Sequence, residues 1–241
     1  METNKEIRPE EQLIAGVDEA GRGAVIGPLV VAGVSVSKSH EQILRKLGVK
    51  DSKLLSPKRR VSLAKAIEKT ANDVMIIKVG PCKIDNYRNQ GVNLNRVEAM
   101  KFAEILSFLE PNCGYVDSPD VKPDRLKSHL LKMIGKDMEL VVEHKADYNY
   151  PVVSAASIIA KVARDEEIEK IKSKYGDVGP GYPSNETTMK WMREWLDNNK
   201  DYPEGIVRKT WMTSKTVNGE RRQKKIHMFL SKLSGKQASD E

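Results

Sequence analysis

Four acidic residues stand where strands of the expected fold end. Asp18 and Glu19 directly follow the apolar run LIAGV. Asp117 follows CGYV, and Asp147 comes a few residues after MELVVE. Burying a carboxylate beside apolar strands is costly unless a cation or another partner compensates its charge. If the three strands are neighbours, the four carboxylates gather in one crevice, where they repel one another unless divalent cations bind.

The residue types in this set favour a hard divalent metal. Oxygen ligands without histidine or cysteine suit Mg²⁺ or Mn²⁺, and pairs of such ions clamp the attacking and leaving oxygens in phosphodiester hydrolysis. The competing interpretation is that the acids are solvated loop residues, and Asp117 in VDSPD also fits a helix cap or an Asx turn. Spacing alone favours this competing interpretation, and only the set taken together suggests a metal site.

A glycine-rich segment follows the first two acids. Gly21 and Gly23 let a backbone approach a ligand closely, and Arg22 between them can meet a phosphate. A tight hairpin turn explains the same segment when it is taken alone. A second polar cluster, at 50–53, offers cations and a hydroxyl, and taken alone it is typical of a solvated turn.

Composition limits the classes of protein that fit. The chain has 241 residues, 39% of them hydrophobic, which suits one large domain, or one domain plus an appendage, with a continuous core. The formal charge of +7 suggests a polyanionic partner without deciding it. The longest apolar stretch, 25–36, is interrupted and falls short of the roughly 18 residues of a membrane helix, and the polar first residues lack a secretory signal. We therefore expect a cytoplasmic protein without a transmembrane segment, and the two isolated cysteines suggest neither a disulfide nor zinc.

The order of elements predicts an α/β fold. Apolar runs with turn residues between them predict a hairpin of strands at 13–17 and 25–36, followed by strands at 74–79, 115–117 and 138–143. Helical spacing and caps predict helices from 56 to about 71, from 93 or 95 to 109, at 123–134 and at 151–174. Strands that first pair locally and then alternate with helices indicate a mixed sheet covered by helices.

The glycines and prolines of GDVGPGYPSN mark a break after this pattern. We place a boundary there, which gives a catalytic domain at 1–175 and a small helical C-terminal region at 176–241. Within the long helix before the break, the acidic run that begins at Asp165 is expected to be a solvated face, paired with lysines at helical spacing.

The motifs, taken together, resemble one family. In order along residues 13 to 215 the chain carries DEAGRG, GP, KDSK, VDS, HKAD, YPVVSAASIIAKVARD and GYPS. Each motif alone is weak, but the ordered set resembles ribonuclease HII of the archaeal kind. The resemblance implies a ribonuclease H-like fold, with a five-stranded mixed sheet flanked by helices and a small helical C-terminal region.

The resemblance also implies an activity. It predicts an endoribonuclease that cleaves the RNA strand of RNA/DNA hybrids and incises 5′ of ribonucleotides embedded in duplex DNA, leaving 3′-hydroxyl and 5′-phosphate ends. The family's metal-binding acids correspond to Asp18, Glu19, Asp117 and Asp147, which would hold two divalent ions, Mg²⁺ or Mn²⁺. We expect a monomer that binds no membrane.

Substrate-binding residues follow from the same resemblance. The loop of Gly21, Arg22 and Gly23 would read the 2′-hydroxyl through main-chain groups. Tyr182 in GYPS would stack against the sugar next to the ribonucleotide. Further expected substrate contacts, mainly to phosphates, are Ser52, Lys53, Lys145, Ser154 and Arg164. Ser154 equally fits a small residue on a helix packing face.

The C-terminal part carries a possible partner site. Residues 208–226 hold seven Lys or Arg and one Glu, a basic stretch that could bind duplex backbone. The end of this stretch overlaps a pattern typical of sliding-clamp-binding peptides. The pattern consists of Gln223, Ile226, Phe229 and Leu230. One helical turn would bring its apolar residues to one side, to enter an apolar pocket. An amphipathic helix packing on its own domain would give the same pattern.

Two other functions stay open at this level. A non-catalytic nucleic-acid-binding or sliding-clamp accessory protein would share the basic C-terminal part, although the intact acids argue against it. A different nuclease or strand-transfer enzyme of the same fold would share the carboxylates and metals but would not require a 2′-hydroxyl.

Overall fold

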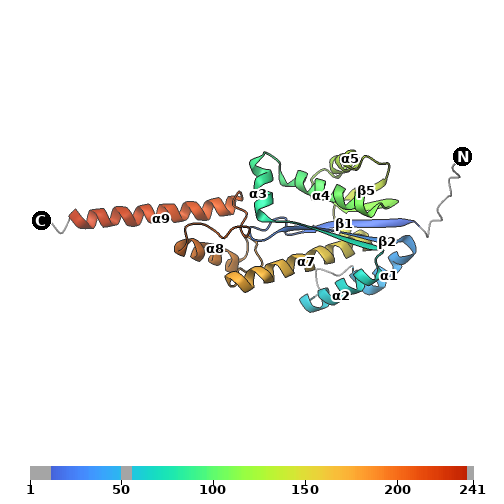
Figure 1. Cartoon of the computed structure of the whole chain (residues 1–241), viewed down its shortest axis with the longest axis horizontal. Coiled ribbons are helices and arrows are strands. Elements are labelled where there is room, and N and C mark those ends of the chain that lie inside the picture. Colours follow the sequence, from blue (N-terminus) through green and yellow to red (C-terminus); the bar gives the residue numbers. More distant parts are fainter. Residues whose placement is uncertain (1–11, 50–55, 238–241) are drawn as a thin grey trace. The chain divides into compact units, whose positions relative to one another are not determined.

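A mixed five-stranded sheet forms the centre of the structure, a computed structural model in which residues 12–49 and 56–237 are described. The strands are β1 (Leu13–Ala20), β2 (Leu29–Ser37), β3 (Asp73–Val79), β4 (Cys113–Asp117) and β5 (Glu139–Glu143) (Figure 1). Their order is β3-β2-β1-β4-β5. β1 pairs antiparallel with β2 and parallel with β4, β2 pairs antiparallel with β3, and β4 pairs parallel with β5. The predicted mixed sheet, with a hairpin feeding parallel strands, is confirmed.

Helices connect and cover the strands. They are α1 (Glu41–Leu47), α2 (Pro57–Thr70), α3 (Pro81–Asn89), α4 (Leu94–Leu109), α5 (Pro123–Ile134), α6 (Ala146–Asn149), α7 (Pro151–Tyr175), α8 (Glu186–Asn198) and α9 (Met212–Gln237), with a 3₁₀ turn at Lys38–His40. Ser56 and Asn93 cap α2 and α4 by accepting backbone hydrogen bonds three residues on. Of the two predicted caps for α4, Asn93 is therefore the one used. None of the helices in the described part is long and apolar enough to cross a membrane.

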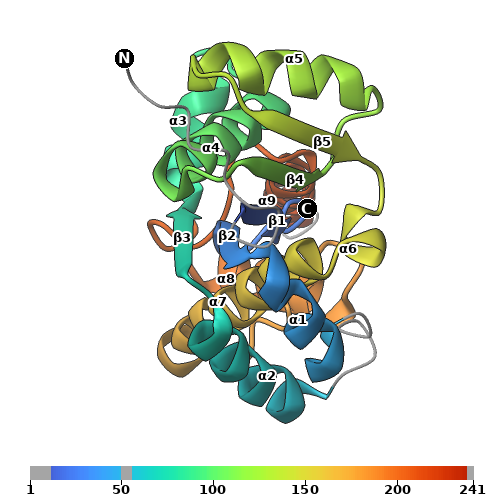
Figure 2. The same ribbon diagram turned by 90° about the vertical axis from the view of Figure 1, so that its right-hand side faces the viewer.

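The sheet is covered on both faces. Figure 2 shows α4 and α5 on one side of it and α1, α2 and α7 on the other. Alternation along the strands separates the two faces, because successive side chains of a strand point to opposite sides. Gly33 lies under α4, where an added Cβ would approach the Ile105 side chain to 2.2 Å. Gly16 lies under α7, where an added Cβ would come within 2.4 Å of the backbone of Val152. Glycine at these positions lets both helices approach the central strands closely.

The chain divides into two compact units. Unit 1 comprises residues 1–22, 28–79 and 91–166, and it holds the sheet. Unit 2 comprises residues 23–27, 80–90 and 167–241. The chain therefore enters unit 2 three times, and the change of unit near the C-terminal end falls inside α7. The expected division into domains at 1–175 and 176–241 remains a prediction.

Unit 2 has a core of its own and internal ties between its three segments. Buried members of the core include Ile26, Ile168 and Met192. Ile26 also forms a β-bridge with Val207. Asp85 of α3 accepts hydrogen bonds from the backbone nitrogens of Lys209 and Thr210, at 2.8 and 3.0 Å. These contacts join segments that lie far apart in the sequence.

One predicted boundary is wrong. The second strand was expected over 25–36, but β2 begins at Leu29, and residues 23–27 belong to unit 2. Gly27, with φ of 84°, ends the apolar run before the strand starts. The C-terminal region was expected to be helical without bounds for its helices, and its last described helix, α9, begins at Met212. The polar residues 213–225 concealed it, because they give little apolar periodicity.

Candidate active site

The end of β1 presents two carboxylates to opposite sides of the sheet. Asp18 lies on the face that α7 covers and is 5% exposed. It accepts hydrogen bonds from the Glu19 backbone nitrogen, at 2.7 Å, and from the Ser157 side chain of α7. Glu19, the next residue, points to the other face, as the two-residue period of a strand requires. The strand thus places one carboxylate on each face, close enough for the charge of Glu19 to raise the pKa of Asp18.

Asp117 ends the neighbouring parallel strand. Val17 is paired with Val116, so continuing the register by one residue sets Asp117 beside Asp18 on the same face. The Asp117 Oδ1 accepts a hydrogen bond of 2.9 Å from the backbone nitrogen of Ala146, at the start of α6. Asp147, the following residue, is 8% exposed. The carboxyl ends of β1 and β4 and the start of α6 are thereby joined.

The first three acids interact electrostatically. Burial raises the pKa of Asp18 well above its usual value, and the charges of Glu19 and Asp117 raise it further, while the Ser157 hydrogen bond lowers it. Burial also raises the pKa of Glu19 to about 7, opposed by the nearby Arg22 and reinforced by Asp117. A bound cation stabilises carboxylates that raise one another's pKa in this way, because it neutralises their mutual repulsion.

The donors suit a hard divalent cation. The Glu19 Oε2 is buried, and no hydrogen-bond partner for it exists among residues 12–49 and 56–237. A buried carboxylate oxygen without a partner is costly, and a metal ion would satisfy it. As the described side chains lie, no three Asp, Glu, His or Cys residues form a metal-coordination shell. The oxygen donors of Asp18, Glu19 and Asp117 nevertheless suit such an ion, and these residues would hold it.

The loop after β1 is anchored to α4 through Arg22. Its guanidinium forms an ion pair with Glu98, whose side chain is 1% exposed. It also donates a hydrogen bond of 2.8 Å to the Asn95 side chain. A buried carboxylate needs a paired cation, so Glu98 fixes where Arg22 lies. The expected contact of Arg22 with a phosphate stays a prediction. In this structure its side chain anchors the loop to α4.

Gly21 and Gly23 differ in their surroundings. Gly21 has φ of 82°, and an added Cβ would approach the Arg164 side chain to 2.4 Å. Arg164 itself is fully buried, with an exposed fraction of 0%. A Cβ on Gly23 would meet nothing within 4 Å in the described part of the chain. Gly21 is thus required by the fold of the loop, whereas the space at Gly23 is compatible with the close approach of a ligand.

The remaining predicted substrate contacts are distributed as follows. The Ser154 hydroxyl donates to the backbone oxygen of Asp147, so it fixes the turn that carries this acid. Lys145 is exposed and has a left-handed backbone with φ of 59°. Tyr182 lies in unit 2, where its backbone oxygen accepts a hydrogen bond from Asn185. Ser52 and Lys53 lie outside the described residues.

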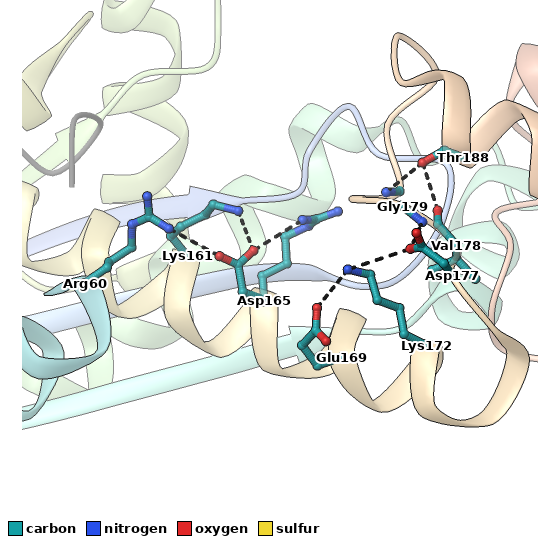
Figure 3. Close-up of polar contacts among 11 residues, drawn as sticks. Arg60, Lys161, Asp165, Glu169, Lys172, Asp177, Val178, Gly179 and Thr188 are labelled. Atoms are coloured by element: carbon teal, nitrogen blue, oxygen red, sulfur yellow. Dashed lines mark hydrogen bonds and ion pairs between the residues drawn. The ribbon is translucent and has the colours of Figure 1, made fainter. Parts of the chain in front are cut away.

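The acidic run on α7 is a network of ion pairs, as expected. Figure 3 shows the Asp165 carboxylate contacted by both Lys161 and Arg60, with Arg60 at 3.4 Å. Further along α7, Lys170 pairs with Glu167 at 2.8 Å. Acids that surface lysines and arginines already neutralise are poor candidates for catalysis. The prediction of a solvated, paired face is confirmed for both.

The basic stretch at 208–226 is partly occupied within unit 2. Arg208 is fully buried and donates from Nε to the backbone oxygen of Gly27, at 3.1 Å. Arg221 donates to two backbone oxygens, and Lys209 and Lys224 pair with aspartates at 2.6 and 3.2 Å. Much of the positive charge that the sequence concentrates here therefore stabilises unit 2. This reduces the number of cations available for duplex backbone.

The clamp-like pattern lies on α9. Gln223 is exposed, and Ile226 is 60% exposed. The positions of the Phe229 and Leu230 side chains fall outside what the structure describes. The exposed Ile226 side chain is accessible to a partner.

Sequence reasoning missed two contributors to the site. Ser157 was not named as a site residue, although its spacing of three from Ser154 on a helix sets both on one face. Glu98 was overlooked as well. It precedes Phe102 and Ile105 by four and seven residues, which puts an acid on the apolar face of α4. A charge on such a face signals a buried partner.

Comparisons with known proteins agree with this geometry. A family model described as Ribonuclease HII matches residues 15–214. Ribonuclease HII of Pyrococcus furiosus is 45% identical over 222 residues, which cover 91% of this chain and 97% of the relative. The crystal structure of the ribonuclease H2 from Pyrococcus horikoshii OT3 superposes with a TM-score of 0.82 at 43% identity, covering 87% of this chain and 99% of that one. The structure of the PCNA:RNase HII complex from Archaeoglobus fulgidus matches at 47% identity with a TM-score of 0.76, covering 81% and 92%.

The sheet, its helices and the carboxylates at its edge define a nuclease with the ribonuclease H-like fold. The chain belongs to the ribonuclease HII family, and the predicted kinship with the archaeal proteins is confirmed. Its activity is that of a ribonuclease H.

Proposed function

We propose that this protein is a metal-dependent endoribonuclease that cleaves the RNA strand of RNA/DNA hybrids and also incises duplex DNA 5′ of an embedded ribonucleotide. The products carry 3′-hydroxyl and 5′-phosphate ends. The observation that carries the proposal is the set of mutually repelling carboxylates at one edge of the sheet, the buried Asp18 and the partly buried Glu19 and Asp117. Membership of the ribonuclease HII family supports the choice of substrate.

The residues of the site divide the work. Asp18, Glu19, Asp117 and Asp147 would hold two divalent ions, Mg²⁺ or Mn²⁺. When bound, such ions lower the pKa of an attacking water and neutralise the leaving oxygen. Ser157 and the Ala146 backbone nitrogen orient Asp18 and Asp117 by hydrogen bonds.

The loop that carries Arg22 selects the sugar. Arg22 is held by Glu98 and Asn95, so the backbone of the loop keeps one position when a substrate arrives. The backbone groups around Gly23 then read the 2′-hydroxyl, because no side chain holds the strand away. A deoxyribose lacks that hydroxyl and leaves the loop groups unpaired, which is the physical basis of discrimination.

A cleavage assay with matched substrates tests the proposal. The purified protein is incubated with a long RNA/DNA hybrid, with a duplex that carries one ribonucleotide, and with the same duplex in all-DNA form. Each reaction is run with Mg²⁺, with Mn²⁺ and with excess chelator. We expect cleavage of the first two substrates only, and only with metal. Asp18→Asn abolishes it, whereas the exposed Asp137→Asn, outside the site, does not. Cleavage in chelator, or full activity of Asp18→Asn, overturns the mechanism.

The same assay separates the two alternatives. A non-catalytic nucleic-acid-binding or clamp accessory protein binds the hybrid tightly but turns over no substrate under any metal. A nuclease of this fold that ignores the sugar cleaves the all-DNA duplex as well as the substituted one.

We also propose that α9 carries a sliding-clamp-binding peptide at Gln223, Ile226, Phe229 and Leu230. The complex of PCNA with the Archaeoglobus fulgidus ribonuclease HII, together with the exposure of Ile226, supports this partner. Calorimetry of the full chain with the clamp of the same organism tests it. Phe229→Ala is expected to weaken binding at least tenfold, roughly 1.4 kcal/mol, while Met212→Ala, an exposed apolar residue on α9 outside the pattern, leaves it unchanged. Absence of binding by the unaltered chain removes the proposal.

A further inference from the structure

A polar groove lies between α4 and α5, wholly within unit 1. Its volume is about 490 Å³, which falls in the range of ligand sites in proteins. The polar side chains that line it, and on which the inference rests, are Asn95, Arg96, Asp120, Arg125, His129 and Lys132. Buried Ala99 and Leu126 add an apolar part to the lining.

The groove has an excess of positive charge. Among the described residues, Asp120 is the only acid that lines it, and Arg125 pairs with Asp120 at 2.6 Å. The Arg125 hydrogen bonds hold the pKa of Asp120 below its usual value, so this pair is neutral overall. Arg96 and Lys132 are exposed, and neither has an ion pair with any described residue. Two uncompensated cations and a histidine therefore face a groove that is suited to an anion.

The groove is connected to the loop of the candidate active site. Asn95 lines the groove and accepts the 2.8 Å hydrogen bond from Arg22. The same side chain hydrogen-bonds to Asp120, three residues beyond the end of β4. A continuous series of polar contacts thus leads from Arg22 through Asn95 and Asp120 to Arg125. The groove begins where the loop is anchored.

The direction of the two helices strengthens the field at this end. α4 leads into β4 and α5 follows it, so both run against the parallel strands and begin at the edge of the sheet that carries the acids. Arg96 and Arg125 are each the third residue of their helix. The amino end of a helix bears a partial positive charge, which adds to that of the arginines.

We propose that this groove binds backbone phosphates of the substrate duplex, away from the phosphate that is cleaved. The inference rests on the proposed function and extends it to a second contact with the same substrate. Cations on the two helices bind phosphates, and the apolar side chains contact the sugar between them. Such contacts position the duplex without reading its bases, so they add affinity and not sequence preference.

Affinity measurements with a double variant test this inference. Arg96→Ala combined with Lys132→Ala removes the two unpaired cations, and Lys69→Ala combined with Lys127→Ala removes two charges of unit 1 that do not line the groove. Binding of a fluorescent duplex is followed by anisotropy in chelator, so cleavage plays no part. We expect the groove variant to bind about tenfold more weakly and to reduce the slope of log Kd against log salt concentration by roughly 2, one for each lost phosphate contact. Its kcat stays that of the unaltered protein, as does the affinity of the control variant.

Duplex length separates a distant phosphate contact from damage to the loop. The ribonucleotide duplex is shortened from one end and then from the other. The affinity difference between variant and unaltered protein should disappear when one particular end is removed and persist when the other is. An equal difference at every length, a fall in kcat, or no difference from the control variant overturns the inference. So does a groove that binds a nucleoside monophosphate or inorganic phosphate while duplex affinity is unchanged by the substitutions. If the unaltered protein binds duplex but cleaves nothing, the proposed function fails. The comparison of duplex affinities then still tests whether the groove binds phosphates.

Discussion

The pairing of Arg22 with Glu98 makes the substrate loop depend on a residue far along the chain. Glu98 is buried and Arg22 is partly exposed. Removing Arg22 and removing Glu98 therefore change the free energy of unfolding by different amounts. Without Arg22, the carboxylate of Glu98 on α4 stays buried with no cation beside it. Breaking such a pair from one side is costly, whereas removing both charges is not.

We therefore expect Arg22→Ala to lower the free energy of unfolding by about 3 kcal/mol. Adding Glu98→Gln to it should recover at least half of that loss, because no buried charge remains. Urea unfolding of the single and double variants measures both. As a control, Lys136→Ala, which breaks an exposed pair with Glu110, should leave stability unchanged. If the double variant is less stable than Arg22→Ala, the buried charge is not the cause.

The carboxylate cluster predicts how metal-free stability changes with pH. The pKa of Glu19 is 4.5 in the unfolded chain and about 7 when folded, so between these values the folded state holds a proton that the unfolded state has lost. Its contribution to stability is complete below pH 4.5 and is lost as the pH rises through 7.

The Glu19→Gln variant lacks this loss. Its free energy of unfolding in chelator should exceed that of the unaltered protein by an amount that grows between pH 5 and pH 8, by roughly 1 to 3 kcal/mol. Glu68→Gln, an exposed acid on α2, should show no such trend. Mg²⁺ should stabilise the unaltered protein more at pH 8 than at pH 5, since protons and metal compete for the same oxygens. Parallel pH profiles for Glu19→Gln and the unaltered protein would refute the assignment.

Tyr182 is the residue whose predicted role depends most on the substrate. If its ring stacks on the sugar beside the ribonucleotide, Tyr182→Ala should reduce kcat/KM for a single embedded ribonucleotide more than for a long hybrid, by about tenfold or more. A long hybrid offers many alternative positions for cleavage, so one lost contact matters less. Tyr148→Ala, an exposed tyrosine on α6, serves as the comparison. Equal losses on both substrates contradict the stacking role.

At the level of elements, the approach of α7 to β1 positions the acids. Gly16 lies two residues before Asp18, and α7 carries Ser157, which bonds to that acid. A side chain at position 16 would meet helix backbone, which cannot move aside as a side chain can.

Gly16→Ala should therefore lower the free energy of unfolding by about 3 kcal/mol and reduce kcat, because α7 is displaced from Asp18. The same substitution at Gly219 should raise stability slightly, since that glycine lies within α9 with nothing within 4 Å among the described residues. Thermal unfolding and cleavage rates measure both. A Gly16→Ala protein of unchanged stability and rate would show that α7 can adjust.

Most of the strands and long helices could be predicted from the sequence, because each has a recognisable local signal. Alternating apolar runs gave all five strands, and caps such as Asn93 gave the long helices of unit 1. α1, α3 and α6 were not predicted because they are short, with seven, nine and four residues. At the site, strand ends located the acids. The partners Ser157 and Glu98 could not be assigned, because which side chain they meet depends on helix packing that no local pattern specifies.

At the scale of the whole molecule, the charge distribution changes meaning once contacts are known. The sequence concentrates cations at 208–226, yet Arg208 is buried and Arg221 bonds to backbone oxygens. Meanwhile the groove of unit 1 holds the uncompensated cations Arg96 and Lys132. The positions of the cations along the sequence therefore do not show which of them are available on the surface to bind a polyanion.

The ties inside unit 2 can be measured by hydrogen exchange. Asp85 accepts the backbone hydrogens of Lys209 and Thr210, and also the Thr210 hydroxyl at 2.6 Å. In Asp85→Ala, exchange at these two amides should accelerate at least tenfold, because their acceptor is gone. Asp177→Ala, in another loop of unit 2, should leave them unchanged. Unaltered exchange in Asp85→Ala would mean that another acceptor protects them.

The threefold entry of the chain into unit 2 has a consequence for recombination between related genes. A crossover within α7 transfers residues 167–241 from one parent, but leaves residues 23–27 and 80–90, with Asp85, from the other. Such a hybrid joins segments of one core from two parents. An exchange that keeps the whole of unit 2 from one parent must therefore carry three separate pieces of the gene, which makes unit 2 hard to inherit as a module.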